Sequence, residues 1–139
     1  MSAAFVIDSS VAMTWLFTDE ATPQTAKLLE RLESESALVP GLWFLEITNV
    51  ISLAERKGRI APAESGEFIR QLSQLGILVD APLRDEIFGE ILPLCRAHQL
   101  TSYDALYLEL VLRSQLPLAT LDEALRKAAK KLGVKLLGK

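Results

Sequence analysis

The chain has little of the side-chain chemistry that many enzymes use near neutral pH. Its 139 residues include one cysteine, Cys95, and one histidine, His98. A single cysteine excludes a disulfide within the chain, which suits a reducing compartment. Cys95 lies in an apolar stretch, so burial is a better interpretation of this residue than nucleophilic catalysis.

The sequence also lacks a targeting or membrane-spanning segment. Its N-terminus has no basic start, and the apolar run Phe5-Val6-Ile7 stops at Asp8, which is too short for a signal peptide or a span. No later run reaches membrane length without a charge. We therefore expect a cytoplasmic protein with no membrane attachment. Half of the residues are hydrophobic, and we expect residues 1–139 to form a single domain.

Charge is distributed unevenly along the chain. The net charge of −3 argues weakly against a nucleic-acid partner. Residues 1–109 contain 8 Lys and Arg against 16 Asp and Glu, whereas residues 110–139 contain 7 against 2. The basic cluster near the end consists of Arg126, Lys127, Lys130, Lys131, Lys135 and Lys139. This cluster is either a solvated helix face or an edge that faces phosphates, and both interpretations remain open.

Short apolar runs alternate with helical patterns. The apolar runs predict five strands, at Phe5–Ile7, Ala37–Val39, Ile77–Val79, Leu118–Thr120 and Val134–Leu137. Capping residues, prolines and glycines predict helices from Ser9 or Ser10 to Leu16, Pro23 to Glu33, Leu42 to Lys57, Pro62 to just before Gly76, Arg84 to His98 with a break at Pro93, Tyr103 to Ser114, and Asp122 to Leu132. Strands separated by helices predict an α/β fold, with a parallel sheet of about five short strands and helices on both faces.

Acidic and polar residues stand at the edges of these elements. Asp8 follows the first strand, Glu46 and Asn49 share one helix face, Asp104 opens a helix, and Asp122 follows the fourth strand. In open α/β sheets, functional residues gather beyond the carboxyl ends of the strands, where the strand order reverses. If the first and fourth strands are neighbours there, Asp8 and Asp122 face each other. Taken alone, each acid could equally be a helix cap or a surface residue.

A cluster of carboxylates needs a cation. Carboxylates repel one another and resist desolvation, so a core gains nothing from gathering them by themselves. A set of oxygen ligands without histidine or cysteine suits Mg²⁺ or Mn²⁺ and does not suit zinc or copper. Such an ion orients and activates water and stabilises charge on a leaving oxygen. The sequence therefore indicates a metal-dependent phosphodiesterase site, with catalytic and metal-binding residues Asp8, Glu46, Asp104 and Asp122.

Four segments around these acids resemble the motifs of the PIN domain family. They are Phe5-Val6-Ile7-Asp8, Trp43-Phe44-Leu45-Glu46-Ile47-Thr48-Asn49, Leu100-Thr101-Ser102-Tyr103-Asp104-Ala105-Leu106-Tyr107-Leu108 and Leu118-Ala119-Thr120-Leu121-Asp122. Their order and spacing match the family over essentially the full length. The compact size and the Tyr-Asp-Ala-Leu-Tyr-Leu segment resemble VapC-type toxins of toxin–antitoxin pairs most.

The resemblance implies an activity and partners. It implies a Mg²⁺- or Mn²⁺-dependent endoribonuclease that hydrolyses RNA, a cognate antitoxin that blocks the cleft, and a homodimer. Large apolar side chains could form contact surface for such partners, although core packing is favoured because aromatics bury readily; these are Trp15, Leu16, Phe17, Trp43 and Phe44.

The resemblance also implies roles for individual residues. The family's metal site is lined by acids at the positions that match Asp8, Glu46, Asp104 and Asp122, and the first and third of these are the steadiest ligands. Polar positions that support the acids match Asn49, Thr101 and Thr120. Only Glu123 follows the last acid closely, so a second metal ion is less expected than the first.

Other functions compete with this interpretation. A phosphoacceptor receiver domain would use Asp80 after the third strand, but it needs an acidic pair after the first strand, where Asp8 stands alone. A haloacid-dehalogenase-like phosphatase needs a second aspartate at the position that Ser10 occupies. A non-cleaving PIN-like module that binds RNA or protein would usually lack one acid, and all four are present.

Overall fold

The sheet is parallel, and the first strand of the chain lies in its middle. A computed structural model of the protein describes residues 2–80 and 87–139. The strand order is β3-β2-β1-β4-β5, with every neighbouring pair parallel. The strands are β1 (Phe5–Ile7), β2 (Ala37–Val39), β3 (Ile77–Val79), β4 (Leu118–Ala119) and β5 (Leu136–Leu137). The predicted α/β class and parallel sheet are confirmed, and only β4 and β5 are shorter than the apolar runs suggested.

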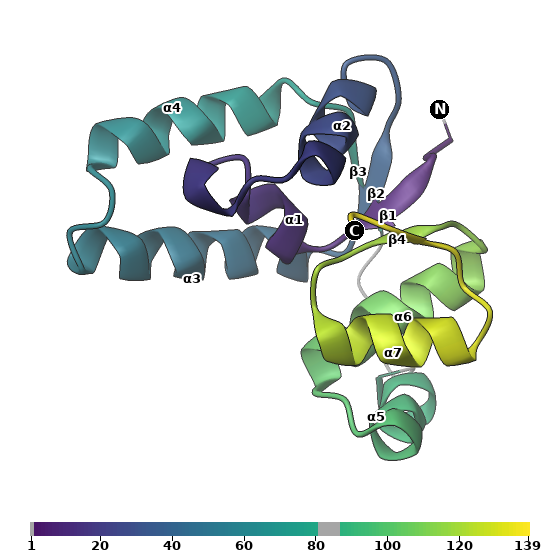
Figure 1. Ribbon diagram of the computed structural model, residues 1–139. Helices are drawn as coiled ribbons and strands as arrows, with labels where there is room; N and C mark the ends of the chain where they lie inside the picture. Colours follow the sequence, from purple (N-terminus) through teal and green to yellow (C-terminus); the bar gives the residue numbers. More distant parts are fainter. Residues whose placement is uncertain (1, 81–86) are drawn as a thin grey trace.

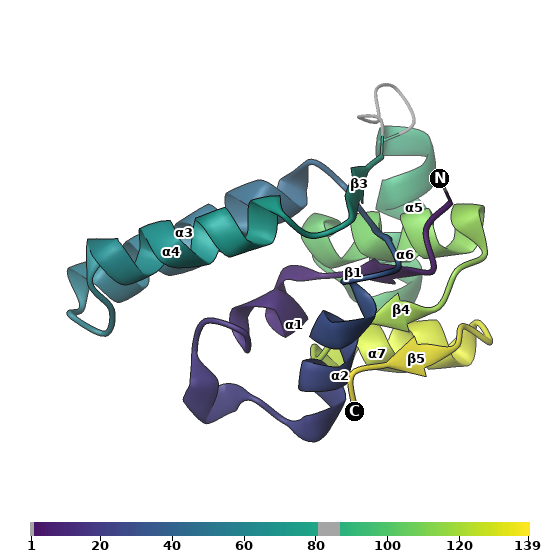
Figure 2. The ribbon, with the colours of Figure 1, turned by 90° about the horizontal axis from the view of Figure 1, so that it is seen from above.

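The helices form two groups that are separated by the strands (Figure 1). The first group is α1 (Ser9–Met13), α2 (Pro23–Arg31), α3 (Leu42–Arg56) and α4 (Pro62–Ser73), with a 3₁₀ turn η1 (Thr18–Glu20). The second group is α5 (Leu92–His98), α6 (Ser102–Ser114) and α7 (Glu123–Lys131), preceded by a π-helical turn η2 (Ile87–Ile91). Figure 2 shows that α3 and α4 extend together away from the sheet as an arm.

The first helix begins and ends differently from the prediction. Its N-cap is Asp8, which accepts hydrogen bonds from the backbone N–H groups of Ser10 and Val11, so neither Ser9 nor Ser10 is the cap. The helix ends at Met13 and does not reach Leu16. Thr14 helps to end it, because its hydroxyl bonds the Val11 carbonyl at 2.7 Å and offers the backbone an alternative to a further helical turn.

Proline divides the segment before α6, as predicted. The π-helical turn η2 runs to Ile91, and α5 starts at Leu92 with Pro93 in its first turn, where a missing N–H is tolerated. Arg84, the predicted start of this helix, lies outside the described residues.

The core is built on β1 and α6. All three residues of β1 are fully buried, and Tyr107 and Leu108 of α6 are buried with them. Among the large apolar residues of uncertain role, Phe17 and Trp43 are core residues, whereas Phe44 is 46% exposed, so core packing is wrong for Phe44. Within residues 2–80 and 87–139, no helix is both long and apolar enough to cross a membrane.

Candidate functional site

The strand order reverses between β1 and β4, and two polar residues meet there. Asp8 directly follows β1 and Thr120 directly follows β4, and the two strands are parallel neighbours. The Asp8 backbone N–H donates to the Ala119 carbonyl at 3.1 Å. The Thr120 hydroxyl donates to Oδ2 of Asp8 at 2.5 Å. The first and fourth strands are therefore neighbours, which is what Asp8 and Asp122 need in order to face the same crevice.

Asp8 is buried and held at both carboxylate oxygens. Its side chain is 5% exposed. The Ser10 hydroxyl donates to Oδ1 at 2.5 Å, and Thr120 donates to Oδ2. Burial raises the pKa of Asp8 to about 6, the bonds from Ser10 and Thr120 oppose that rise, and the negative charge of Glu46 adds to it.

The same two hydroxyls organise the loop that carries Asp122. The Asp122 backbone N–H donates to the Thr120 hydroxyl at 3.0 Å, and the Leu121 N–H donates to the Ser10 hydroxyl at 2.9 Å. Asp122 is the N-cap of α7, where its Oδ1 accepts from the Leu125 N–H at 2.8 Å. The start of α1 and the loop after β4 are therefore joined through hydroxyl groups.

Arg126 also stabilises the loop that carries Asp122. Its Nη1 donates to the Thr120 carbonyl at 2.6 Å and to the Leu137 carbonyl at 2.9 Å. The guanidinium group therefore ties the carboxyl ends of β4 and β5 together. One member of the predicted basic cluster is thus committed to the backbone beside the acids.

Glu46 is placed by a tyrosine of the opposite helix group. The Tyr107 hydroxyl donates to Oε1 of Glu46 at 2.6 Å, joining α6 to α3. Burial raises the pKa of Glu46, and the bond from Tyr107 acts in the opposite direction. Burial, the bond to Glu46 and the nearby negative charges raise the pKa of Tyr107, so this phenol stays protonated and remains a donor.

Asp104 lies within electrostatic range of Asp122 and Glu46. It lies in the first turn of α6, and its backbone N–H donates to the Thr101 hydroxyl, which caps that helix, at 3.2 Å. Burial raises the pKa of Asp104 to about 6, and the negative charges of Asp122 and Glu46 add to the rise. Each of the four predicted acids is therefore within electrostatic range of at least one other.

The predicted supporting residues differ in what they contact. Thr120 bonds Asp8 directly, and Thr101 bonds the backbone of Asp104. Asn49 is exposed on α3, and in the described part of the chain its side chain bonds none of the four acids. A role for Asn49 stays a prediction.

The four carboxylates have no cationic side chain to neutralise them. In the described ranges, no Lys, Arg or His forms an ion pair with any of them. The donor set contains only oxygen, which fits a hard divalent cation such as Mg²⁺ or Mn²⁺. Across residues 2–80 and 87–139, however, no three acidic, histidine or cysteine side chains are already arranged to hold an ion. Asp8, Glu46 and Asp122 instead accept hydrogen bonds from hydroxyl and N–H donors.

Three residues of this site were missed from the sequence. Ser10 lies two residues after Asp8, a spacing typical of aspartates that bond nearby backbone and hydroxyl groups. Tyr107 lies three residues after Asp104 on one helix face, so its position was predictable, although its bond to Glu46 was not. The sequence does not indicate the hydrogen bonds of Arg126, because its partners are backbone carbonyls.

The receiver-domain alternative does not fit the sheet. Receiver domains of the flavodoxin-like type have the strand order 2-1-3-4-5, whereas this sheet has β3 at its edge and β1 at its centre. Asp80, the residue that would accept the phosphoryl group, is bound by both terminal nitrogens of Arg113, at 3.2 and 2.7 Å. The arrangement at Asp80 is that of a structural ion pair.

Comparisons with known proteins agree with the fold. The sequence matches the PIN domain family over residues 5–131. A crystal structure of PAE2754 from Pyrobaculum aerophilum is similar, with 25% identity, a TM-score of 0.71, and coverage of 96% of this chain and 83% of that chain. A toxin–antitoxin complex from Klebsiella pneumoniae has 18% identity, a TM-score of 0.57 and 87% coverage of both chains, and at that identity it supports the fold alone. Comparison with curated proteins gives no match.

Proposed function

The chain belongs to the PIN domain family, and from this premise we propose that it is a Mg²⁺- or Mn²⁺-dependent endoribonuclease and the toxin of a toxin–antitoxin pair. One observation carries the proposal most strongly. Four carboxylates that pair with no cationic side chain of the described residues gather beyond the carboxyl ends of β1 and β4; they are Asp8, Glu46, Asp104 and Asp122. The proposal treats residues 1–139 as one domain that acts on cytoplasmic RNA.

The residues of the chain have distinct roles in the proposed hydrolysis. Asp8, Asp104 and Asp122 would hold the cation, and Glu46 would bind it or position the attacking water. A bound divalent ion supplies the positive charge that offsets both the acids and the phosphate. Ser10 and Thr120 orient Asp8, and Tyr107 orients Glu46. Because burial raises the pKa of Glu46, its carboxylate is a better proton acceptor for the attacking water.

Replacement of one central acid tests the site. Asp8→Asn should lower Mn²⁺-dependent cleavage of single-stranded RNA by about 100-fold or more, because it removes a charged ligand and keeps the side-chain shape. The measurement is the cleavage rate of a fluorescently labelled RNA pool. Asp19→Asn, an exposed acid that pairs with Arg59, is the matched control and should retain the full rate. Full metal-dependent activity in Asp8→Asn, from a preparation free of other nucleases, would show that the site assignment is wrong.

The non-cleaving alternative is separated by two parallel assays. A PIN-like module that only binds RNA predicts metal-dependent binding without any new product. A nuclease predicts product that appears with Mg²⁺ or Mn²⁺ and disappears with EDTA. The presence of all four acids favours cleavage, because a binding role alone gives no reason to bury Asp8 and half-bury Asp104.

We also propose where the antitoxin binds. The arm of α3 and α4 carries an apolar groove of about 550 Å³, whose walls include Trp43, Phe44, Ile47, Ile51, Ile69 and Leu72. Within the described residues, the buried indole N–H of Trp43 has no acceptor. An apolar segment of a partner would fill the groove. A similar fold has been solved in a toxin–antitoxin complex, and the proposal takes from it only that the partner is an antitoxin.

The groove assignment predicts a variant that separates inhibition from activity. Ile69 is 53% exposed, so Ile69→Asp should place a charge in the groove without unfolding the chain. We expect weaker inhibition by the cognate antitoxin, by about 10-fold or more, and unchanged RNA cleavage by the free enzyme. Leu132→Asp, at another exposed apolar position, is the control. Equal inhibition of both variants would place the antitoxin elsewhere.

A further inference from the structure

We propose that Tyr103 is a base-binding residue, whose ring stacks on an unpaired nucleobase next to the phosphate at the acidic site. The inference rests on the proposed ribonuclease function and adds a subsite to it. Tyr103 directly precedes Asp104 in the first turn of α6, and its side chain is 59% exposed. Tyr103 is therefore the chain neighbour of a proposed metal ligand, and its ring is open to solvent.

The position of Tyr103 follows from its helix. Residues four apart lie on the same helix face, so Tyr103 is one turn nearer the start of α6 than Tyr107. Tyr107 is 1% exposed, and its hydroxyl ends at Glu46. Of the two tyrosines on this face, Tyr107 is therefore buried in the core and Tyr103 is exposed to solvent. In the described residues, no hydrogen bond engages the Tyr103 side chain, so the fold gives no reason for an exposed ring here.

A second exposed apolar side chain stands next to one of the acids in the sequence, on α3. Leu45 directly precedes Glu46 and is 68% exposed. Two of the acids are therefore preceded by a large apolar side chain that faces solvent. Apolar side chains grouped at a polar cleft are typical of binding surfaces. A phosphate group does not pack on apolar side chains, whereas the flat face of a base does.

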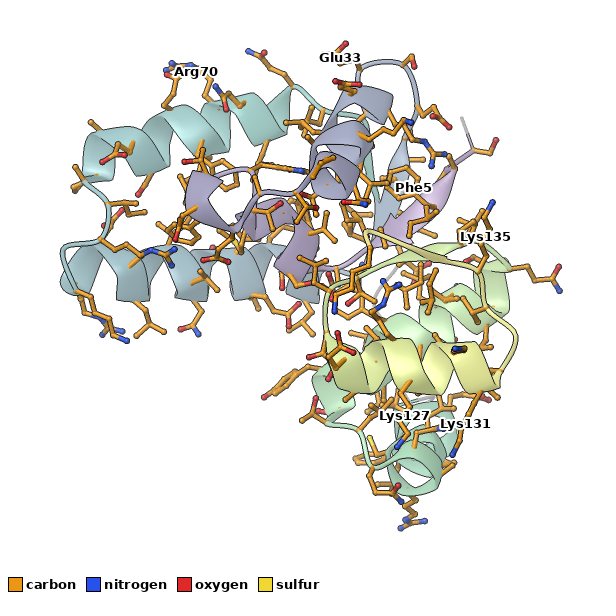
Figure 3. All side chains as sticks on the ribbon, in the orientation of Figure 1. Phe5, Glu33, Arg70, Lys127, Lys131 and Lys135 are labelled. Atoms are coloured by element: carbon orange, nitrogen blue, oxygen red, sulfur yellow. The ribbon has the colours of Figure 1, made fainter. Side chains whose placement is uncertain are left out.

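The charge distribution strengthens this argument. In the described residues no cationic side chain pairs with the four carboxylates, so they repel the RNA backbone until a metal ion is bound. Figure 3 shows Lys127 and Lys131 on the side of α7 that faces away from the strands, and Lys139 pairs with Glu123. A contact that does not depend on charge would add affinity close to the acids. Stacking of a base on an aromatic ring is such a contact, and single-stranded RNA exposes the bases for it.

Binding measurements test the subsite independently of cleavage. The probe is a single-stranded RNA with 2-aminopurine placed at each position in turn, because stacking quenches its fluorescence. The protein is the full chain with Asp8→Asn, in Ca²⁺. We expect quenching at one position. Adding Tyr103→Ala should abolish this quenching and weaken binding by about 5- to 150-fold. Tyr103→Phe should retain both properties, Tyr103→Leu should lose the quenching, and Leu132→Ala should change neither.

Cleavage gives a second, paired measurement. With Asp8 present and Mn²⁺ added, an abasic residue at the quenched position should lower kcat/KM for the unaltered chain and have no further effect on Tyr103→Ala. Quenching that depends on Tyr103 without any cleavage would retain the subsite and reject the nuclease. Metal-dependent cleavage together with unchanged RNA binding by Tyr103→Ala would retain the nuclease and reject the subsite. The subsite is also rejected if no RNA binds, or if Tyr103→Ala weakens only inhibition by the antitoxin.

Discussion

Asp8 shows how neighbouring hydroxyls favour the charged form of a buried carboxylate. Burial favours its protonated form, while Ser10 and Thr120 donate hydrogen bonds that favour the charged form. One hydroxyl comes from the first turn of α1 and the other from the residue after β4, so together they also fix where the carboxylate lies. The position of Asp8 at the end of a buried strand was predictable from the apolar run before it, and its role as a metal ligand stays a prediction. The hydrogen bonds from Ser10 and Thr120 were not predictable, because they depend on which strands are neighbours.

The raised pKa of Asp8 predicts how stability depends on pH. The folded chain releases this proton near pH 6, whereas the usual pKa is 3.8. Between these values the folded state binds more protons than the unfolded state, so this residue's contribution to stability falls as the pH rises from about 4 to 6. Asp8→Asn removes the penalty, and we expect its free energy of unfolding at pH 8 to exceed that of the original chain by about 1–3 kcal/mol.

Urea denaturation at pH 4 and pH 8 in EDTA checks this expectation. The gain from Asp8→Asn should shrink at pH 4, where the carboxyl is protonated in the folded chain. Asp104 has a pKa raised in the same direction and should add to the trend. A gain of equal size at both values would mean that the pKa of Asp8 in the folded chain is not raised.

At the scale of elements, strands were easier to predict than helix ends. All five apolar runs became strands because buried parallel strands need continuous apolar side chains. Helix ends depend on competing hydrogen bonds, and Thr14 and Asp8 decided the ends of α1 in ways that periodicity does not show. The short final strands are joined at their carboxyl ends by Arg126, whose acceptors carry no sequence signal.

This arginine supports a specific prediction about β4 and β5. Arg126→Met keeps much of the apolar stem but leaves the Thr120 and Leu137 carbonyls without their donor. We expect the free energy of unfolding to fall by about 1.5–3 kcal/mol. Urea denaturation at pH 7 gives this value. Lys130→Met, at an exposed position of the same helix, should change it by less than about 0.5 kcal/mol. Equal effects of the two substitutions would show that the bonds of Arg126 contribute nothing.

At the scale of the whole molecule, the order of the strands creates the site. Alternating strands and helices predict a parallel sheet, but no local pattern states that β1 and β4 are neighbours. Four acids from distant parts of the chain were therefore predicted to meet through the family resemblance and the rule for strand reversal. The side-chain directions of Asp8, Glu46 and Asp122 could not be predicted, because their hydrogen-bond donors come from residues whose placement depends on the fold. A homodimer stays a prediction, which sedimentation velocity would check.

The uncompensated charge predicts stabilisation by divalent ions. Mn²⁺ that binds only the folded chain should raise the free energy of unfolding by about 2.7 kcal/mol at 100 times its Kd. The rise in Tm should be larger at pH 8 than at pH 5, because protons compete for Asp8 and Asp104, whose pKa values are raised to about 6. Asp8→Asn should reduce the rise, whereas Asp19→Asn should not. Thermal scans with Mn²⁺ and with EDTA measure both effects, and equal shifts in the two variants would mean that the ion binds elsewhere.

The central place of β1 has a consequence for synthesis on the ribosome. Asp8 emerges early, but its partner Thr120 is 112 residues further along. Until β4 has left the exit tunnel, the nascent polypeptide holds Asp8, Glu46 and Asp104 without Thr120 and Asp122. The acidic edge is therefore completed only after synthesis has passed β4.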